Sequence, residues 1–303
     1  MNIRDLEYLV ALADHRHFGE AAAACFVSQP TLSTQIKKLE TELGVDLLER
    51  NPRALTLTSV GERVVEEARL ILGHVKDLNL TAQSARDPES GSLRLGVFPT
   101  LGPYLLPIVV SPLHERYPRL ELLLSEEKSP VLVEKLHDGS LDAALLATPV
   151  RADFHEELLF REDFVLAAPL GHPLAQSHEP VSVSDLAGHE VLLLEEGHCL
   201  RDQALSVCQL VGANERRDFR ATSLETLRQM VVAGVGVTLL PRLAVNESHE
   251  RLALREFVEP APSRDIALYW RHSHPATSFL TGFAQRLRDN LTSTKGVTLV
   301  GAD

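Results

Sequence analysis

Cysteine is scarce in this sequence: its 303 residues include only Cys25, Cys199 and Cys208. So few cysteines in so long a chain exclude a small secreted domain held together by disulfides. No pair follows the CxxC spacing, which argues against a thioredoxin motif and a structural zinc site. The histidines show no metal-ligand spacing either. The sequence therefore predicts neither a metal nor a cofactor.

Long apolar runs are also missing. No segment approaches the roughly 18 consecutive apolar residues of a transmembrane helix. The first five residues, MNIRD, lack the apolar core of a signal peptide. We therefore expect a cytoplasmic protein without a membrane partner. The hydrophobic content of 44% and charged content of 24% are ordinary for a globular protein, and the length suggests two or three domains.

Positive charge is not in excess, since the net charge is −12. This value argues weakly against a general nucleic-acid binder but does not exclude a local basic surface. Residues 1–57 carry six Lys and Arg against eight Asp and Glu. Any DNA binding by this part would therefore depend on where the cations lie and on two copies of the domain.

What the sequence does have is a cysteine pair on one expected helix. After the strand-like run 191–194, apolar residues recur with helical spacing from Leu200 to Val211, and Gly212 is the expected end. Nine residues of helix place the α-carbons of Cys199 and Cys208 about 13 Å apart on roughly opposite faces. A disulfide needs α-carbons within about 7 Å. The pair can bond only if this segment unwinds, which is typical of a switch; two unrelated free cysteines remain the alternative.

Cys199 is also placed to react. A helix N-terminus and neighbouring cations stabilise a thiolate, and His198 and Arg201 flank this cysteine. Asp202 is expected to orient one of them. Cys25, in contrast, is interpreted as a packing residue of a short helix.

Residues 1–57 predict three helices and a wing. The third helix begins after Ser28 as N-cap, buries Leu32, Ile36, Leu39 and Leu43, and ends at Gly44. Its other side is short and polar, as in a recognition helix for the major groove. Two β-like pieces, 46–50 and 55–57, suggest a wing with arginines for phosphates. The predicted DNA-binding residues are Gln29, Pro30, Thr31, Ser33, Thr34, Lys37, Arg50 and Arg53. The alternative is a plain three-helix bundle.

A long helix is expected next, from Thr58 to about residue 86. Its apolar residues are spaced four and three apart, as in a coiled-coil seam: Val64, Ala68, Ile71, Val75, Leu78 and Ala82. Such a seam predicts a dimer with two recognition helices on two half-sites. Packing of this helix on the chain's own body is the alternative. Residues 86–92 are expected to be a linker.

Strand and helix patterns alternate from residue 92 onward, which predicts βαβαβ and a mostly parallel sheet. A second set begins at Phe164, and the chain returns at 266–270 with a last helix over 276–290. This return implies two lobes with two crossovers and a ligand cleft between them. Residues from about Ser293 are expected to be a loose tail. Arg264 is expected either to pair across the lobes or to lie on the surface.

Motifs in both parts resemble the LysR-type transcriptional regulators. The segments that carry the resemblance are 18–23, 28–33, 38–50, 57–61, 171–175, 222–227 and 231–241. The resemblance covers nearly the whole chain and implies an α/β fold class with a winged helix-turn-helix, a linker helix and a two-lobed regulatory domain like periplasmic binding proteins. The expected boundaries are 1–57, 58–91 and 92–303. Lobe I is expected over about 92–161 and 267–303, and lobe II over about 162–266.

Within that family, segments 99–107 and 197–204 resemble the peroxide-responsive activators. This resemblance implies that hydrogen peroxide oxidises Cys199, which then condenses with Cys208 to form a reversible disulfide. The implied peroxide pocket comprises Thr100, Ser129, His198, Arg201 and Asp202, with serine at a position where these activators usually carry threonine. Promoter DNA, RNA polymerase, a dimer of dimers and a thiol reductant such as glutaredoxin are the implied partners, and the protein is not expected to be an enzyme.

Two other functions stay open from the sequence. One is a LysR-type regulator that binds a small organic acid between its lobes, with incidental cysteines. The other is a thiol peroxidase with a helical bundle attached. The expected recognition helix argues against this second function.

Overall fold

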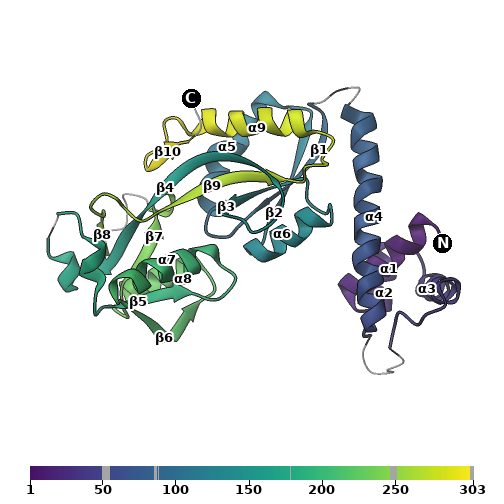
Figure 1. Cartoon of the computed structure of the whole chain (residues 1–303), viewed down its shortest axis with the longest axis horizontal. Coiled ribbons are helices and arrows are strands. Elements are labelled where there is room, and N and C mark those ends of the chain that lie inside the picture. Colours follow the sequence, from purple (N-terminus) through teal and green to yellow (C-terminus); the bar gives the residue numbers. More distant parts are fainter. Residues whose placement is uncertain (50–54, 85–86, 88, 178, 246–250, 301–303) are drawn as a thin grey trace. The chain divides into compact units, whose positions relative to one another are not determined.

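The computed structural model describes the chain except residues 50–54, 85–86, 88, 178, 246–250 and 301–303 (Figure 1). The chain divides into two compact units. The N-terminal unit comprises Met1–Arg86 together with His137–Ser140, and the regulatory unit comprises Asp87–Leu136 and Leu141–Asp303.

The N-terminal unit is helical, as predicted. Its helices are α1 (Ile3–His15), α2 (Phe18–Ala24), α3 (Gln29–Leu43) and α4 (Ser59–Ser84). Asn2 and Asp5 form a capping box at the start of α1. The Ser28 hydroxyl accepts a hydrogen bond from the Thr31 amide at the start of α3, and Gly44 ends that helix with φ 72°. These caps confirm the predicted bounds of the third helix.

The core of this unit forms where the first three helices meet. Leu9, Leu12, Leu32, Ile36 and Leu39 are fully buried there. The prediction for Leu43 is wrong, because this residue is 38% exposed at the end of α3.

The predicted wing is represented by one antiparallel bridge, between Leu48 and Leu57. The Thr58 hydroxyl accepts a hydrogen bond from the Gly61 amide (2.9 Å) and so caps α4. Arg50 and Arg53, the predicted phosphate contacts, lie outside the described residues.

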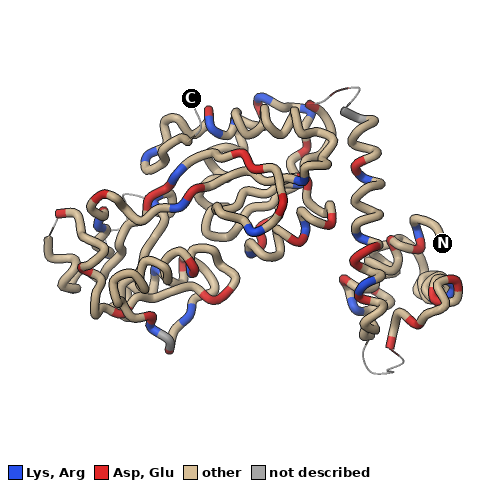
Figure 2. Tube along the Cα trace, viewed as in Figure 1, with Lys and Arg blue, Asp and Glu red and all other residues tan. Residues whose placement is uncertain are grey.

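The long helix α4 uses its apolar residues in two ways. Val65 packs into the core of its own unit. Of the predicted seam, Val64 also packs against this core and Ala68 is 1% exposed, whereas Ile71 is 39% exposed. All three lie along an open groove of about 390 Å³. Farther along, Leu78 is 69% exposed. Acidic and basic residues are interspersed along the helix (Figure 2). The part of the seam from Ile71 onward is therefore largely uncovered within this unit.

Lobe I of the regulatory unit is built on the predicted βαβαβ arrangement. Strand β1 (Gly91–Val97) pairs in parallel with β2 (Leu120–Glu126) and β3 (Ala143–Ala147). Helices α5 (Gly102–Arg116) and α6 (Ser129–His137) make the two connections. The strand order is β10-β4-β9-β3-β1-β2, where β9 (Ser263–Trp270) lies antiparallel to both β3 and β4.

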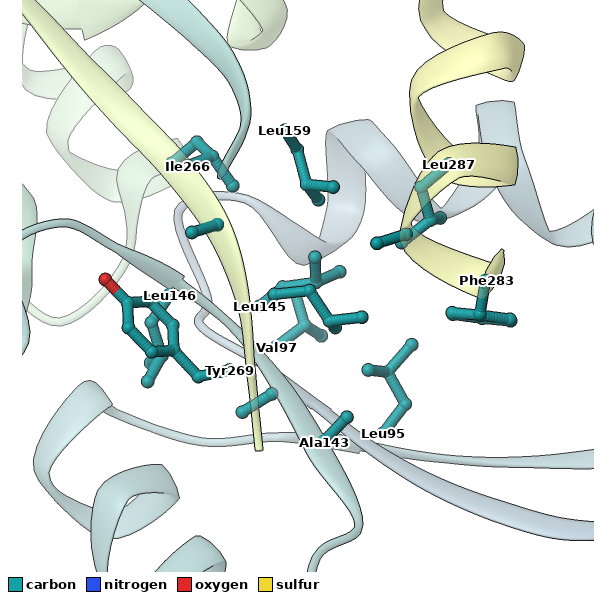
Figure 3. Close-up of a cluster of buried hydrophobic side chains, with 14 of the residues drawn as sticks. Leu95, Val97, Ala143, Leu145, Leu146, Leu159, Ile266, Tyr269, Phe283 and Leu287 are labelled. Carbon is teal, nitrogen blue, oxygen red and sulfur yellow. The ribbon is translucent and has the colours of Figure 1, made fainter. Parts of the chain in front are cut away.

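The core of lobe I lies between this sheet and two helices. Side chains of β1 and β3 gather beneath α9 (Thr277–Leu291), with Leu95 and Leu145 near Phe283 and Leu287 (Figure 3). On the other face, a Cβ added at Gly96 would lie 2.6 Å from the Leu132 side chain of α6. Only glycine therefore allows α6 to approach β1 this closely.

Strand β4 (His155–Pro169) carries the chain from one lobe to the other. Its first part pairs with β9, and its second part pairs with β7 (Thr238–Pro241) and β8 (Leu252–Arg255). Lobe II adds the parallel pair β5 (Glu190–Leu194) and β6 (Asn214–Ala221), with α7 (Cys199–Val211) and α8 (Leu224–Val232). Short 3-10 turns lie at Pro173–Ala175, Val183–Leu186 and Arg242–Ala244. Lobes I and II have separate hydrophobic cores, so the regulatory unit is two-lobed.

Three predictions for this unit are wrong. The large sheet is not mostly parallel: β1 pairs in parallel with β2 and β3, but the pairings of β4 and β9 are antiparallel because the chain crosses to lobe II and returns. The strand expected to begin at Phe164 begins at His155, because its first half is an amphipathic part of the lobe I sheet. The tail from Ser293 is not loose: β10 (Val297–Leu299) pairs antiparallel with β4 at the edge of the sheet. No helix in the described ranges is long and apolar enough to cross a membrane.

Candidate functional site

Helix α7 carries Cys199 as its first residue and Cys208 near its end, as predicted. Gly197 turns the chain with φ 89° after strand β5, and Gly212 ends the helix with φ 70°. Both positive φ values favour glycine. The cysteine thiols are free. With the helix intact, nine residues of rise hold the two α-carbons about 13 Å apart, beyond the reach of a disulfide.

Cys199 lies at a cleft between the lobes. The cleft has a volume of about 830 Å³. Lobe I contributes Ser129 and an apolar wall to it, while α7 contributes the cysteine and polar side chains. Its lining residues are Ser129, Pro130, Val133, Leu146–Arg151, Gly197, Cys199, Asp202, Gln203 and Ser206. The Cys199 side chain packs against the lobe I core, whereas the next residue, Leu200, belongs to the lobe II core.

Burial and polar neighbours act in opposite directions on the Cys199 thiol. Burial is the larger effect and raises the pKa. The Arg264 charge, the hydroxyls of Ser129 and Thr100 and the Leu200 amide lower the same pKa. The groups that favour a thiolate are thus present at the helix start, but burial outweighs them, so the thiol form is favoured in this reduced geometry.

Arg264 supplies the positive charge near this thiol. Its side chain is fully buried and forms an ion pair with Glu162 (2.8 Å). It also donates to the Thr100 hydroxyl and carbonyl, both at 3.0 Å, and lies over the Phe98 ring. The second Glu162 oxygen accepts from the Leu243 amide. The surface alternative for Arg264 is therefore wrong.

Thr100 and Ser129 lie close enough to Cys199 to act on its pKa. Because the Thr100 hydroxyl accepts from Arg264, its own proton remains available to the sulfur. The Ser129 hydroxyl is buried at the start of α6 and has no well-formed hydrogen bond within the described part of the chain. It can therefore hold a small polar ligand beside the thiol.

His198 and Arg201 do not act as the predicted cations. Burial and the Lys128 charge lower the pKa of His198, which leaves the ring neutral near pH 7. The Arg201 guanidinium donates to the Leu194 carbonyl (3.1 Å) and pairs with Glu215 (2.9 Å). Arg201 is buried in lobe II and is absent from the cleft lining. Asp202, in contrast, lines the cleft as an exposed residue.

Cys208 occupies a different environment. It is 1% exposed within the lobe II core, and burial raises the pKa of its thiol to about 11. Cys25 is the C-cap residue that follows α2 and packs against the core of the N-terminal unit, in keeping with its predicted packing role.

Sequence reasoning missed Gln203 and Arg151, which line the cleft, and left the role of Arg264 open. The Gln203 Oε1 atom is buried without a partner among the described residues. Arg264 lies between Ser263 and Asp265 at the polar start of β9, so the local sequence does not distinguish it from a surface arginine. Within the described ranges, no group of three or more His, Cys, Asp or Glu side chains is placed to hold a metal ion.

Helix α3 exposes one polar face. Six predicted DNA-binding residues are exposed on it: Gln29, Pro30, Thr31, Ser33, Thr34 and Lys37. The opposite face is buried through Leu32, Ile36 and Leu39. The Thr34 hydroxyl donates to the Pro30 carbonyl one turn earlier in the same helix (2.8 Å), and the residue is exposed.

Two known families match these units. The bacterial regulatory helix-turn-helix protein family, lysR type, matches residues 3–62, and the LysR substrate binding domain matches residues 86–292. A hydrogen peroxide-inducible genes activator of Pectobacterium carotovorum subsp. carotovorum is 49% identical over 294 residues, which cover 96% of this chain and 97% of that protein.

Solved structures of OxyR proteins are similar as well. Full-length OxyR from Pseudomonas aeruginosa, in a variant form, has 38% identity and a TM-score of 0.76 over 95% of both chains. A hydrogen-peroxide-bound OxyR mutant from Corynebacterium glutamicum has 34% identity and a TM-score of 0.66 over 96% of this chain and 92% of that one. Reduced and oxidised forms of OxyR have 40% and 42% identity, each with a TM-score of 0.63 over 68% of this chain and 98% and 99% of theirs.

Similarity over nearly the whole length, together with both domain matches, agrees with the helix-turn-helix and the two-lobed cleft. The chain belongs to the LysR family of DNA-binding transcription regulators and, within it, to the group of the OxyR hydrogen peroxide-inducible genes activators.

Proposed function

We propose that this protein senses hydrogen peroxide through Cys199 and is switched by a reversible Cys199–Cys208 disulfide. One observation carries the proposal: a cleft-facing cysteine begins the same helix that stores a second cysteine in an apolar core. The relatives known as peroxide-inducible activators, and the peroxide-bound, reduced and oxidised OxyR structures, support it.

The first step takes place at the start of α7. Peroxide enters the cleft, where the Ser129 hydroxyl holds one of its oxygens. The Cys199 thiolate, held by Arg264 and Thr100, attacks an oxygen atom. The O–O bond breaks, and the departing hydroxide becomes water by taking up the proton that the thiol released when it ionised. The sulfur is left as a sulfenic acid.

The second step requires α7 to unwind. The Cys208 sulfur attacks the sulfur of the sulfenic acid, the S–O bond breaks, and the oxygen leaves as water with the Cys208 proton. Two thiols and one peroxide thus yield one disulfide and two waters. Because the two sulfurs cannot meet while α7 is wound, the packing of lobe II around this helix and Cys208 must change, and its outer surfaces change with it. A thiol reductant such as glutaredoxin restores the thiols by exchange.

The N-terminal unit turns this change into altered DNA binding. The polar face of α3 reads the major groove, and the predicted wing arginines, Arg50 and Arg53, contact phosphates. The uncovered seam of α4 pairs with the same helix of a second copy. A dimer of dimers then re-spaces its recognition helices on promoter DNA and changes the access of RNA polymerase. The cellular setting proposed for this activity is the cytoplasm.

Promoter footprinting tests the proposal directly. Wild-type protein should change its footprint on a target promoter after stoichiometric peroxide, and Cys199→Ser should not. In parallel, wild type should lose two thiols, whereas Cys208→Ser should stop at one oxidised Cys199. Unchanged thiols at low peroxide would contradict the sensor and favour an organic-acid regulator. Steady peroxide turnover with a reductant at enzyme-like rates would favour a thiol peroxidase.

A further inference from the structure

Lys128 connects lobe I to the loop that leads into α7. It directly precedes Ser129 and forms an ion pair with the carboxylate of Glu195. It also donates to the main-chain carbonyl of Glu196 (3.2 Å). We propose that these contacts, here called the Lys128 latch, hold the Cys199 end of α7 in place and slow disulfide formation; this inference rests on the proposed redox function.

The loop is folded closely over the Lys128 side chain. Gly197 has φ 89°, and a Cβ added there would lie 3.0 Å from Cδ of Lys128. The aliphatic stem of the lysine therefore supports the turn from one side, while its ammonium group binds the two residues before the turn. Cys199 follows only two residues later.

Disulfide formation must displace one end of α7. The α-carbons have to approach from about 13 Å to within about 7 Å. The Cys208 end is buried in the lobe II core and ends in the Gly212 turn. Residues of lobe II also hold the helix start, where Arg201 binds the Leu194 carbonyl and Glu215. Lys128 differs because it pulls the same loop toward lobe I, so Cys199 cannot move far into lobe II until the latch opens.

The latch acts on the second step and leaves the first unchanged. The groups that set the Cys199 pKa are Arg264, Ser129, Thr100 and the Leu200 amide, and neither member of the Lys128–Glu195 pair is among them. Removing the latch should therefore leave sulfenic acid formation as it is. The attack of Cys208 on that sulfenic acid, with loss of water, should become faster because the loop is freer.

The expected size follows from the exposure of the pair. Both side chains are more than a third exposed, and exposed ion pairs contribute modestly. We expect Lys128→Met to speed disulfide formation roughly two- to fivefold. Lys128→Arg should keep the wild-type rate, and Glu195→Gln should have a smaller effect because the Glu196 contact remains. Lys135→Met is the matched control, since Lys135 pairs with Glu127 (2.9 Å) within lobe I.

The experiment uses the full-length chain. Disulfide formation after stoichiometric peroxide is followed by quenching with an alkylating reagent and intact-mass analysis. Sulfenic acid formation is trapped with dimedone in the Cys208→Ser background, with and without Lys128→Met. Raising the salt concentration should speed disulfide formation in wild type but not in Lys128→Met, because salt weakens an exposed ion pair. Circular dichroism confirms that each variant is folded.

Each failure has its own signature. If the wild type forms the disulfide and Lys128→Met forms it at the same rate or more slowly, the latch is overturned and the redox function is not. Slower dimedone trapping in Lys128→Met would also overturn it, because the lysine would then position the thiol for peroxide. A wild type that forms no disulfide with peroxide overturns the redox function and the latch together.

Discussion

The two ends of α7 each carry a cysteine, and their surroundings differ. Cys199 faces a cleft, with hydroxyls and a buried guanidinium acting on its sulfur. Cys208 is enclosed by apolar side chains, and burial raises its thiol pKa to about 11. One thiol is thus open to small polar molecules, and the other is protected until the helix unwinds. The contrast sets an order of events in which Cys199 reacts first.

Arg264 is the charge that most distinguishes the Cys199 end, so removing it should have the largest effect. Its partner Glu162 is fully buried. Arg264→Met leaves that carboxylate uncompensated and should cost about 3–5 kcal/mol of stability. It should also raise the Cys199 pKa further and slow alkylation of this thiol at neutral pH. Urea unfolding and peptide-resolved alkylation measure the two effects.

Arg161→Met is the matched control for this change. Arg161 pairs with Asp265, which directly follows Arg264 in the chain, but the arginine side chain is 52% exposed. Its loss should cost less than about 1 kcal/mol. Equal stability losses in the two variants would mean that the buried charge does not distinguish the Cys199 end.

Replacing each cysteine with serine should change the stability by a smaller amount, and by different amounts at the two ends of α7. Cys208→Ser places a hydroxyl in the lobe II core and should cost about 1–2 kcal/mol, since a bond to the helix backbone only partly compensates its burial. Cys199→Ser lies at the helix start beside the cleft and should stay within about 0.5 kcal/mol of wild type. Thermal unfolding of the reduced proteins measures the difference. A larger loss of stability in Cys199→Ser than in Cys208→Ser would reverse the comparison.

Local signals predicted much of this site. Helical periodicity and Gly212 gave the bounds of α7, and the alternation of strands and helices predicted both lobes. The ion partner of Arg264 could not be predicted from local patterns. Glu162 lies 102 residues away in the chain, and only the pairing of β4 with β9 brings the two residues together. This contact depends on the tertiary fold, which no local pattern encodes.

The prediction that Arg201 lies beside the Cys199 thiol failed for the opposite reason, because it relied on closeness along the chain. It lies two residues after Cys199, and two helical steps turn a side chain by about 200°. The arginine therefore points into lobe II, where it meets Glu215, while the cysteine faces the cleft. Polar residues at i+3 or i+4 of the helix, here Asp202 and Gln203, were the better candidates for the cleft, and both line it.

The smallest expected change concerns the Ser129 hydroxyl, which lowers the Cys199 pKa. Ser129→Ala should raise this pKa further, because the variant loses the hydroxyl that lowers it. Because the thiolate is the reactive form, the alkylation rate of Cys199 should rise with pH in both proteins, with the curve of the variant displaced to higher pH. Ser206→Ala is the matched control: Ser206 lines the same cleft, but its hydroxyl donates to the Asp202 carbonyl. An unshifted curve for Ser129→Ala, or an equal shift in the control, would remove Ser129 from the features that set the Cys199 end apart from the Cys208 end.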